Sequence, residues 1–179
     1  MLSLVRRRSR ERAAHQLYCA AVAAARQPYF YERLGVPDTL DGRFEMVGLH
    51  AFLLIRRLQQ LADPETRMAQ AVFDAMFSDM DTTLREMGVG DLGVGKRVRV
   101  MWEAFHGRAA AYQLPLADRN SQRLAEALAR NVWRDPAALV PAARLAAIAM
   151  AQDRHLATQD SSALAAGKAE FLSPEAVAA

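Results

Sequence analysis

Cysteine, isoleucine and strand-like patterns are scarce in this chain of 179 residues. Cys19 is the one cysteine, which excludes an internal disulfide and a cysteine-based zinc site and fits a reducing compartment. Ile55 and Ile148 are the only isoleucines, and no run alternates apolar and polar residues with the period of two that half-buried strands show. The sequence therefore predicts no β-sheet.

Long hydrophobic runs are missing as well. The longest apolar stretch, near residues 46–55, is interrupted by His50 and is far shorter than the roughly 20 residues of a membrane-spanning helix. The basic start, residues 1–12, is not followed by the apolar segment of about 7–15 residues that a secretory signal contains. We expect neither a secretion signal nor a membrane span.

Charge gives little information about partners. Lys96 and Lys168 are the only lysines, and the arginine that replaces lysine elsewhere, together with abundant alanine, is typical of a GC-rich genome. The formal net charge of +3 is too small to indicate nucleic acid on its own. We expect no specific nucleic-acid partner.

Apolar residues recur with the period of about 3.6 that defines amphipathic helices. We predict one all-α domain over residues 1–179, a bundle of about six to seven helices, with a basic, frayed start at 1–12 and a poorly defined tail at 160–179. The segment at 43–62 is apolar nearly all round, which predicts the central helix of the bundle. Asp63 and Pro64 are the expected cap and first residue of the next helix. Helices are expected at residues 9–26, 28–34, 43–62, 64–87, 94–112, 120–133 and 135–156.

A glycine-rich connection, "REMGVGDLGVGKRVRV" at residues 85–100, resembles two phosphate-binding motifs. Both motifs need a β-strand before the first glycine, and a P-loop needs Ser or Thr where Arg97 stands. Because an amphipathic helix precedes the glycines, we predict a helix-to-helix connection and no nucleotide cofactor. Gly88 is expected to end one helix in the left-handed conformation and Asp91 to cap the next. Gly93 and Gly95 are expected to let two helices approach closely.

Three carboxylates follow the middle of the helix at 64–87, at Asp79, Asp81 and Glu86. Helical geometry places Asp81 on one flank of the apolar stripe and the other two on the opposite flank, so they cannot share a metal ion. Asp81 and Arg85 are expected to form an ion pair one turn apart. The sequence thus favours a solvated or partner-facing surface and no metal.

Histidines do not supply a metal site either. Glu103 and His106 have the spacing of half a di-iron site, but no second such pair is present, so a salt-linked surface pair is the simpler interpretation. His50, inside the apolar helix, is expected to be a hydrogen-bonded core residue.

Arg97 and Arg108 lie beside or within the apolar stripe of the helix at 94–112. A charge in that position must be paired or must reach outward, and Asp41, Asp79 or Glu86 is the expected partner. Two interpretations stay open: a structural ion pair, or a polar anchor in a groove that binds a partner.

The methionines and the basic start leave similar choices. The methionines at 76, 80, 87 and 101 belong either to plain core or to an adaptable groove for apolar helices. The arginines at 6, 7, 8, 10 and 12 either contact anionic lipid or ribosomal RNA, or form a solvated end. Chemistry alone describes a soluble helical domain with a binding surface.

Two long stretches resemble a known family: "GVPDTLDGRFEMVGLHAFLLIRRL" and "AQAVFDAMFSDMDTTLREMGVGDLGVGKRVRVMWEAFHGRAAAY". They are similar to the ubiquinol–cytochrome c chaperones, assembly factors of respiratory complex III, and the likeness covers about residues 15–135. It implies an all-helical, non-enzymatic chaperone; mitochondrial members associate with newly made cytochrome b at the inner membrane, with a small partner protein, near the ribosome exit. The residues that match the family motif are Asp79, Asp81, Arg85, Glu86, Gly88, Asp91, Lys96 and Arg97. The absence of a long presequence predicts a bacterial, cytoplasmic form, peripheral at the inner face of the inner membrane.

The resulting hypothesis is a chaperone, without cofactor or metal, that holds cytochrome b or another apolar client by shape and charge. It places a groove near the helix pair at 73–112, with peripheral contact to the membrane or the ribosome. The alternatives are a helical adaptor with an unrelated partner, or a metal- or quinone-binding helical enzyme. The predicted partner-binding residues are Asp79, Asp81, Arg85, Glu86, Asp91, Lys96, Arg97 and Arg108.

Overall fold

The computed structural model describes the backbone of residues 2–61 and 63–178 and the side chains of 7–61 and 67–177. Over these residues the chain is helical and forms no β-strand, which confirms the all-α prediction. Asp63 is the first residue of α4 and not its cap, and its side chain, like those of Pro64 and Arg6, lies outside the described residues. The helices are α1 (Leu2–Ala25), α2 (Pro28–Glu32), α3 (Leu40–Gln59), α4 (Asp63–Glu86), α5 (Asp91–Ala117), α6 (Ser121–Leu128) with a π-helical extension (Ala129–Trp133), α7 (Leu139–Thr158), α8 (Ser161–Ala165) and α9 (Pro174–Ala178).

Helix α3 is the centre of the fold, as its all-round apolar pattern predicts. It is in contact with α1, α4, α5 and α7, and nearly every residue from Phe44 to Leu58 is buried. The helix begins three residues earlier than expected because Thr39 caps it, accepting a hydrogen bond from the Gly42 amide at 3.2 Å. Gly42 is required there, since a Cβ would lie 1.9 Å from the Pro37 carbonyl oxygen.

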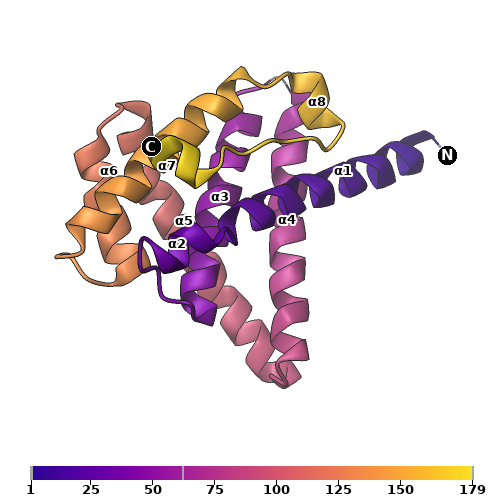
Figure 1. Ribbon diagram of the computed structural model, residues 1–179. Helices are drawn as coiled ribbons and strands as arrows, with labels where there is room; N and C mark the ends of the chain where they lie inside the picture. Colours follow the sequence, from indigo (N-terminus) through magenta and orange to yellow (C-terminus); the bar gives the residue numbers. More distant parts are fainter. Residues whose placement is uncertain (1, 62, 179) are drawn as a thin grey trace.

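Two groups of helices pack on this centre (Figure 1). Helices α1 and α4 cross over one side of α3, and the antiparallel pair α6 and α7 lies on the other. Helix α7 is joined to α3 by an ion pair from Arg56 to Asp153, with Nε and Oδ1 3.1 Å apart. The segment after α7 is held by Gln152, whose side chain donates to the Leu172 carbonyl and accepts from its amide, both at 2.8 Å.

Helices α4 and α5 form a hairpin that converges at the glycine connection, at the lower end of Figure 1. Gly88 has φ +81°, so it ends α4 in the left-handed conformation, as predicted. The prediction for Asp91 is wrong: Gly90 is the capping residue and Asp91 is the first residue of α5. The close-approach prediction is wrong too. A Cβ at Gly95 would meet no atom within 4 Å, and one at Gly93 would meet only the Val89 side chain of the connection itself, so neither glycine is needed for a close approach of the two helices.

Other helix boundaries shift for local reasons. Helix α1 begins at Leu2 rather than at residue 9, and α5 continues through Pro115 to Ala117. Helix α7 begins at Leu139 rather than after Asp135, because Arg134 adopts φ +54° and the Asp135 carboxylate accepts from the Ala137 amide in a tight turn.

Candidate functional site

An aromatic groove lies between α3, α4 and α5 and encloses about 700 Å³. The sequence predicts two apolar stripes here, and the structure brings them together while leaving space between them. We call this space the aromatic groove. Its lining side chains are Phe52, Ile55, Gln59, Arg67, Ala69, Gln70, Phe73, Trp102, Phe105, His106, Ala109, Ala110 and Gln113.

The aromatic rings hold one another in a fixed arrangement. Phe73 of α4 meets Phe105 of α5 edge to face, with ring centroids 5.6 Å apart, and meets His106 at 5.4 Å. Trp102 stacks on His106 with centroids 4.0 Å apart and keeps 45% of its surface exposed at the mouth. Buried Phe105 therefore forms the bottom of the groove, and Trp102 lies at its entrance, held by His106. Tryptophan is among the residues that contribute most to binding at protein interfaces.

Polar groups of the groove lie around its edge. Arg67, Gln59, Gln70 and Gln113 line it from α3, α4 and α5. Gln70 donates to Asp74 at 2.7 Å. The groove is thus apolar in its centre and rich in amides at its rim, an arrangement that suits an apolar segment whose ends stay in water.

A cluster of three charges closes the hairpin beside the glycine connection. Arg85 Nε donates to Asp81 Oδ2 at 2.6 Å, which confirms the predicted ion pair, and Arg85 Nη1 contacts the Asp91 carboxylate. Hydrogen bonding to Asp81 and then to Asp91 raises the pKa of Arg85 above its ordinary value. The cluster links the end of α4 to the start of α5, where two walls of the aromatic groove meet.

The remaining charges near the connection point into solvent. Glu86, Lys96 and Arg97 are exposed, and within 7–61 and 67–177 none of their side chains forms an ion pair. For Arg97 the structural ion pair is therefore wrong, and its role as a polar anchor for a partner stays a prediction. Near the glycine connection, only a narrow stripe of α5 is buried against the rest of the protein. Val94 lies at the centre of this stripe, and Arg97 lies outside it.

Arg108 is paired, but with a residue that sequence reasoning missed. Its Nε and Nη2 donate to the two carboxylate oxygens of Glu45 on α3. Glu45 is only 4% exposed, and burial raises the pKa of its carboxyl while Arg108 opposes that rise. The predicted partners are wrong: Asp41, for example, pairs with Arg134 at 2.8 Å.

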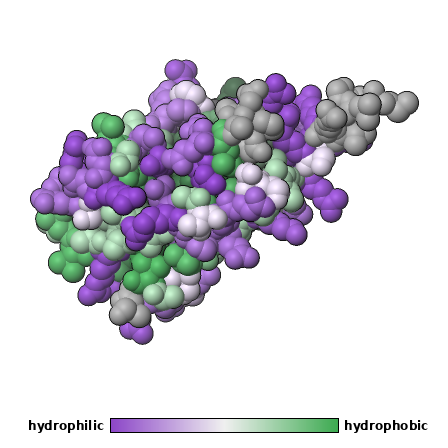
Figure 2. All heavy atoms as spheres, turned by 90° about the horizontal axis from the view of Figure 1, so that it is seen from above, coloured by the Kyte–Doolittle hydropathy of each residue, from purple (hydrophilic) through white to green (hydrophobic). Residues whose placement is uncertain are grey.

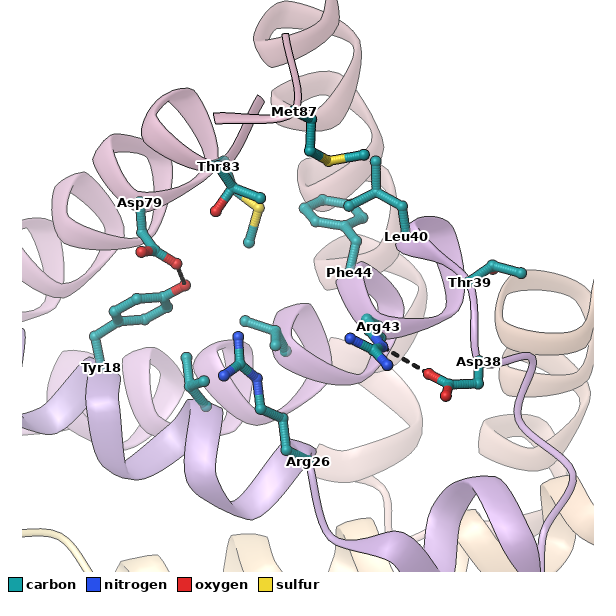
Figure 3. A pocket seen from close by; sticks show the side chains of 13 residues that line it. Tyr18, Arg26, Asp38, Thr39, Leu40, Arg43, Phe44, Asp79, Thr83 and Met87 are labelled. Atoms are coloured by element: carbon teal, nitrogen blue, oxygen red, sulfur yellow. Dashed lines mark hydrogen bonds and ion pairs between the residues drawn. The ribbon is translucent and has the colours of Figure 1, made fainter. Parts of the chain in front are cut away.

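Asp79 faces the opposite side of α4 from the aromatic groove. Its Oδ2 accepts a hydrogen bond from the Tyr18 hydroxyl at 2.7 Å, in a second, smaller hollow between α1, α3 and α4 (Figure 3). Burial first, then this bond, raises the pKa of Tyr18 far above its ordinary range. The predicted residues therefore occupy three separate places: the hairpin, the Glu45 pair and the smaller hollow.

The other candidate groups are structural. His50 is buried, its Nδ1 lies 2.8 Å from the Met46 carbonyl oxygen, and burial lowers its pKa to about 4, which confirms a core histidine. The predicted Glu103–His106 pair is wrong, because Glu103 accepts from Arg99 at 3.0 Å and His106 Nδ1 lies 2.9 Å from the Trp102 carbonyl oxygen.

The methionines divide between the two interpretations that their sequence left open. Met76 and Met80 are buried, Met101 is half-buried, and Met87 is 57% exposed. Met80 and Met87 line the smaller hollow, and none of these methionines lines the aromatic groove. These methionine side chains thus belong to the core and to the smaller hollow.

Two searches over the described part of the chain gave negative findings. No group of three or more metal-ligating side chains comes together there. None of its helices combines the length and hydrophobicity that crossing a membrane requires. Figure 2 shows the surface from above, where hydrophobic residues form separate patches between hydrophilic ones.

A packed helical fold with an open aromatic groove is typical of helical domains that bind a segment of a partner protein. Within that class, the chain belongs to the ubiquinol–cytochrome C chaperone family, whose model matches residues 32–171. The match confirms the family resemblance of the two long sequence stretches.

Individual relatives agree with this membership. The chain is 26% identical over 120 residues to ubiquinol-cytochrome-c reductase complex assembly factor 1 of Xenopus laevis. This alignment covers 67% of the chain and 60% of that relative, so the chain spans about three fifths of its length. The fold is similar to the crystal structure of the Cbp3 homolog from Brucella abortus, with a TM-score of 0.86, 38% identity and 97% of each chain covered.

Proposed function

We propose that this protein is a non-enzymatic chaperone of respiratory complex III assembly and that its client is cytochrome b. Family membership and the printed name of the Xenopus relative, a complex III assembly factor, support the assembly role. Cytochrome b follows from the family resemblance and from its chemistry, since an apolar membrane protein needs cover before it is inserted and assembled. The observation that carries the proposal is the aromatic groove with its exposed Trp102.

The groove binds by burial of apolar surface. Each large apolar side chain that enters it contributes about 1.5–3 kcal/mol, so a few side chains of a client segment supply a free energy of the same order as the cost of association and exceed it only slightly. Affinity is therefore modest, and the client can be released when its proper neighbours become available. A holding function requires this reversibility.

The polar residues have two roles in this proposal. The amides of Gln59, Gln70 and Gln113 at the rim hydrogen-bond backbone groups at the ends of the bound segment. Asp81, Arg85 and Asp91 keep α4 and α5 at the angle that holds the groove open. The protein acts at the inner face of the bacterial inner membrane, where its client is inserted.

A gene deletion with complementation tests the proposal. Deletion is expected to lower the haem b signal in membrane spectra and the ubiquinol–cytochrome c reductase activity. Ala110→Glu places a charge in the groove at an exposed helical position, and the matched control Ala143→Glu makes the same change on exposed α7. The control should restore both readouts and Ala110→Glu should not.

Two results contradict the proposal at different levels. Normal spectra and activity after deletion would overturn the assembly role. Full restoration by Ala110→Glu would overturn the groove as the binding site. Circular dichroism of both purified variants establishes that they fold alike.

A further inference from the structure

The smaller hollow between α1, α3 and α4 is separate from the aromatic groove and shares no lining residue with it. It encloses about 310 Å³, at the lower end of the range of small-molecule sites. Val22, Phe44, Val47 and Met80 supply apolar side chains to its walls. At its mouth Met87, which is half exposed, lies near Leu40 (Figure 3).

Four charged side chains line the hollow, and three of them are already engaged. Asp38 accepts from Arg43 Nε at 2.6 Å, and Asp79 accepts from the Tyr18 hydroxyl. Arg26 makes no side-chain ion pair or hydrogen bond within the described side chains, and its guanidinium points into the hollow in Figure 3. An arginine that forms no ion pair with the described side chains thus faces a half-enclosed space with mainly apolar walls.

We propose that this hollow binds a single-chain amphiphile: the apolar chain lies against Val22, Phe44 and Met80, and one anionic head group is held by Arg26. The planar fork of an arginine matches both carboxylate and phosphate oxygens, so a fatty acid and a lysophospholipid share the required chemistry. The hydroxyl of Thr83 lines the same wall and is an additional donor. This inference goes beyond the chaperone function and does not depend on it.

Substitutions of Asp79 and Arg26 should change the affinity for an anionic amphiphile in opposite directions. Its carboxylate lies across the hollow from Arg26 and repels an anionic head group, while the hydrogen bond to Tyr18 holds it in place. Asp79→Asn removes the charge but keeps an amide oxygen that accepts from Tyr18. This variant should therefore bind an anionic amphiphile more tightly, and Arg26→Gln should bind it more weakly.

Isothermal titration calorimetry on the delipidated full chain, below micellar concentrations, measures these effects. Sodium myristate and lysomyristoyl phosphatidylglycerol are the anionic probes, and myristyl alcohol is the neutral one. We expect one molecule bound per chain, with the alcohol about tenfold weaker than the better anionic probe, the worth of one charge-assisted contact. Whichever anionic probe binds more tightly identifies the head group.

The variants separate the site from non-specific binding. Arg26→Gln is expected to lose about tenfold in affinity for the anionic probe, and Asp79→Asn to gain a few-fold, with no change for the alcohol. Arg33→Gln removes an exposed arginine that does not line the hollow and should behave as the unchanged chain does. Ala110→Glu, in the aromatic groove, should also bind normally.

Each opposite result overturns the proposal. The proposal is wrong if the unchanged chain does not bind the anionic probes, or if it binds myristate and the alcohol with equal affinity. It is also wrong if Arg26→Gln and Arg33→Gln lose affinity equally. Loss of binding in Ala110→Glu would place the amphiphile in the aromatic groove instead. Because Arg26 is exposed and Asp79→Asn conserves shape, both variants are expected to keep the fold, which melting curves check.

Discussion

The buried ion pair of Glu45 and Arg108 predicts a loss of stability that depends on pH. Arg108→Met removes both hydrogen bonds to a carboxylate that is almost inaccessible to water. Breaking a buried pair from one side costs about 3–5 kcal/mol, and we expect about 3 kcal/mol at pH 8 because the Arg108 side chain keeps 21% of its surface exposed.

The pH dependence follows from the pKa of Glu45. Burial raises this pKa above its ordinary value of 4.5, and the hydrogen bonds and charge of Arg108 lower it by part of that increase. Without Arg108 the pKa in the folded state rises further, so the folded variant takes up a proton more readily than the unfolded chain does. A raised folded-state pKa gives stability that is present at low pH and lost as the pH rises through it. The deficit of the variant should therefore shrink to about 1 kcal/mol at pH 5, the worth of lost hydrogen bonds.

Urea unfolding followed by far-ultraviolet circular dichroism at pH 5 and pH 8 measures this deficit. The double variant Glu45→Met/Arg108→Met leaves no buried charge, and it should recover to within about 1 kcal/mol of the unchanged chain. Arg99→Met, which breaks the exposed pair with Glu103, is the control and should change little at either pH. An equal deficit at both pH values, or no recovery in the double variant, would refute the reasoning, since lost packing would then explain the effect.

Two further predictions concern the core histidine and the glycine connection. The pKa of His50 falls from 6.5 to about 4 on folding, so the free energy of unfolding should decrease by up to about 3 kcal/mol as the pH drops through that interval. A His50→Gln variant should lack this part of the pH dependence in melting curves. The same pH dependence in the variant would contradict the assignment. Gly88→Ala should destabilise by about 1 kcal/mol because of its left-handed backbone, whereas Gly95→Ala, in open space within α5, should stabilise by up to about 1 kcal/mol; urea midpoints that move in the same direction for both would contradict this.

The helices up to α7 could be predicted because their patterns are local in sequence, whereas α8 and α9, in the tail, were not predicted. The all-round apolar pattern of residues 43–62 identifies the central helix, and the left-handed end at Gly88 follows from the need for a residue without a Cβ there. The predicted pair of Asp81 and Arg85 is also local, since both residues lie on one helix face. Boundaries were less accurate, as at α7, where Asp135 stabilises a turn rather than the helix start.

Contacts between helices could not be predicted from periodicity. A helical wheel shows which side of α5 carries Arg108, but not that this side faces Glu45, which lies 63 residues away on α3. The bond from Tyr18 to Asp79 is hidden for the same reason. The aromatic groove depends on how far α4 and α5 diverge from their connection, and the contacts of both helices with α3 contribute to this angle.

Site-specific photocrosslinking tests the central claim, that the aromatic groove holds cytochrome b, most directly. Benzoylphenylalanine at position 102 places the reactive group at the mouth of the groove, and the same residue at position 143 places it on exposed α7. After irradiation of growing cells, we predict that mass spectrometry identifies cytochrome b crosslinked to position 102 and not to position 143. Crosslinks to cytochrome b from position 143 alone, or from neither position in cells that assemble complex III normally, would contradict the account.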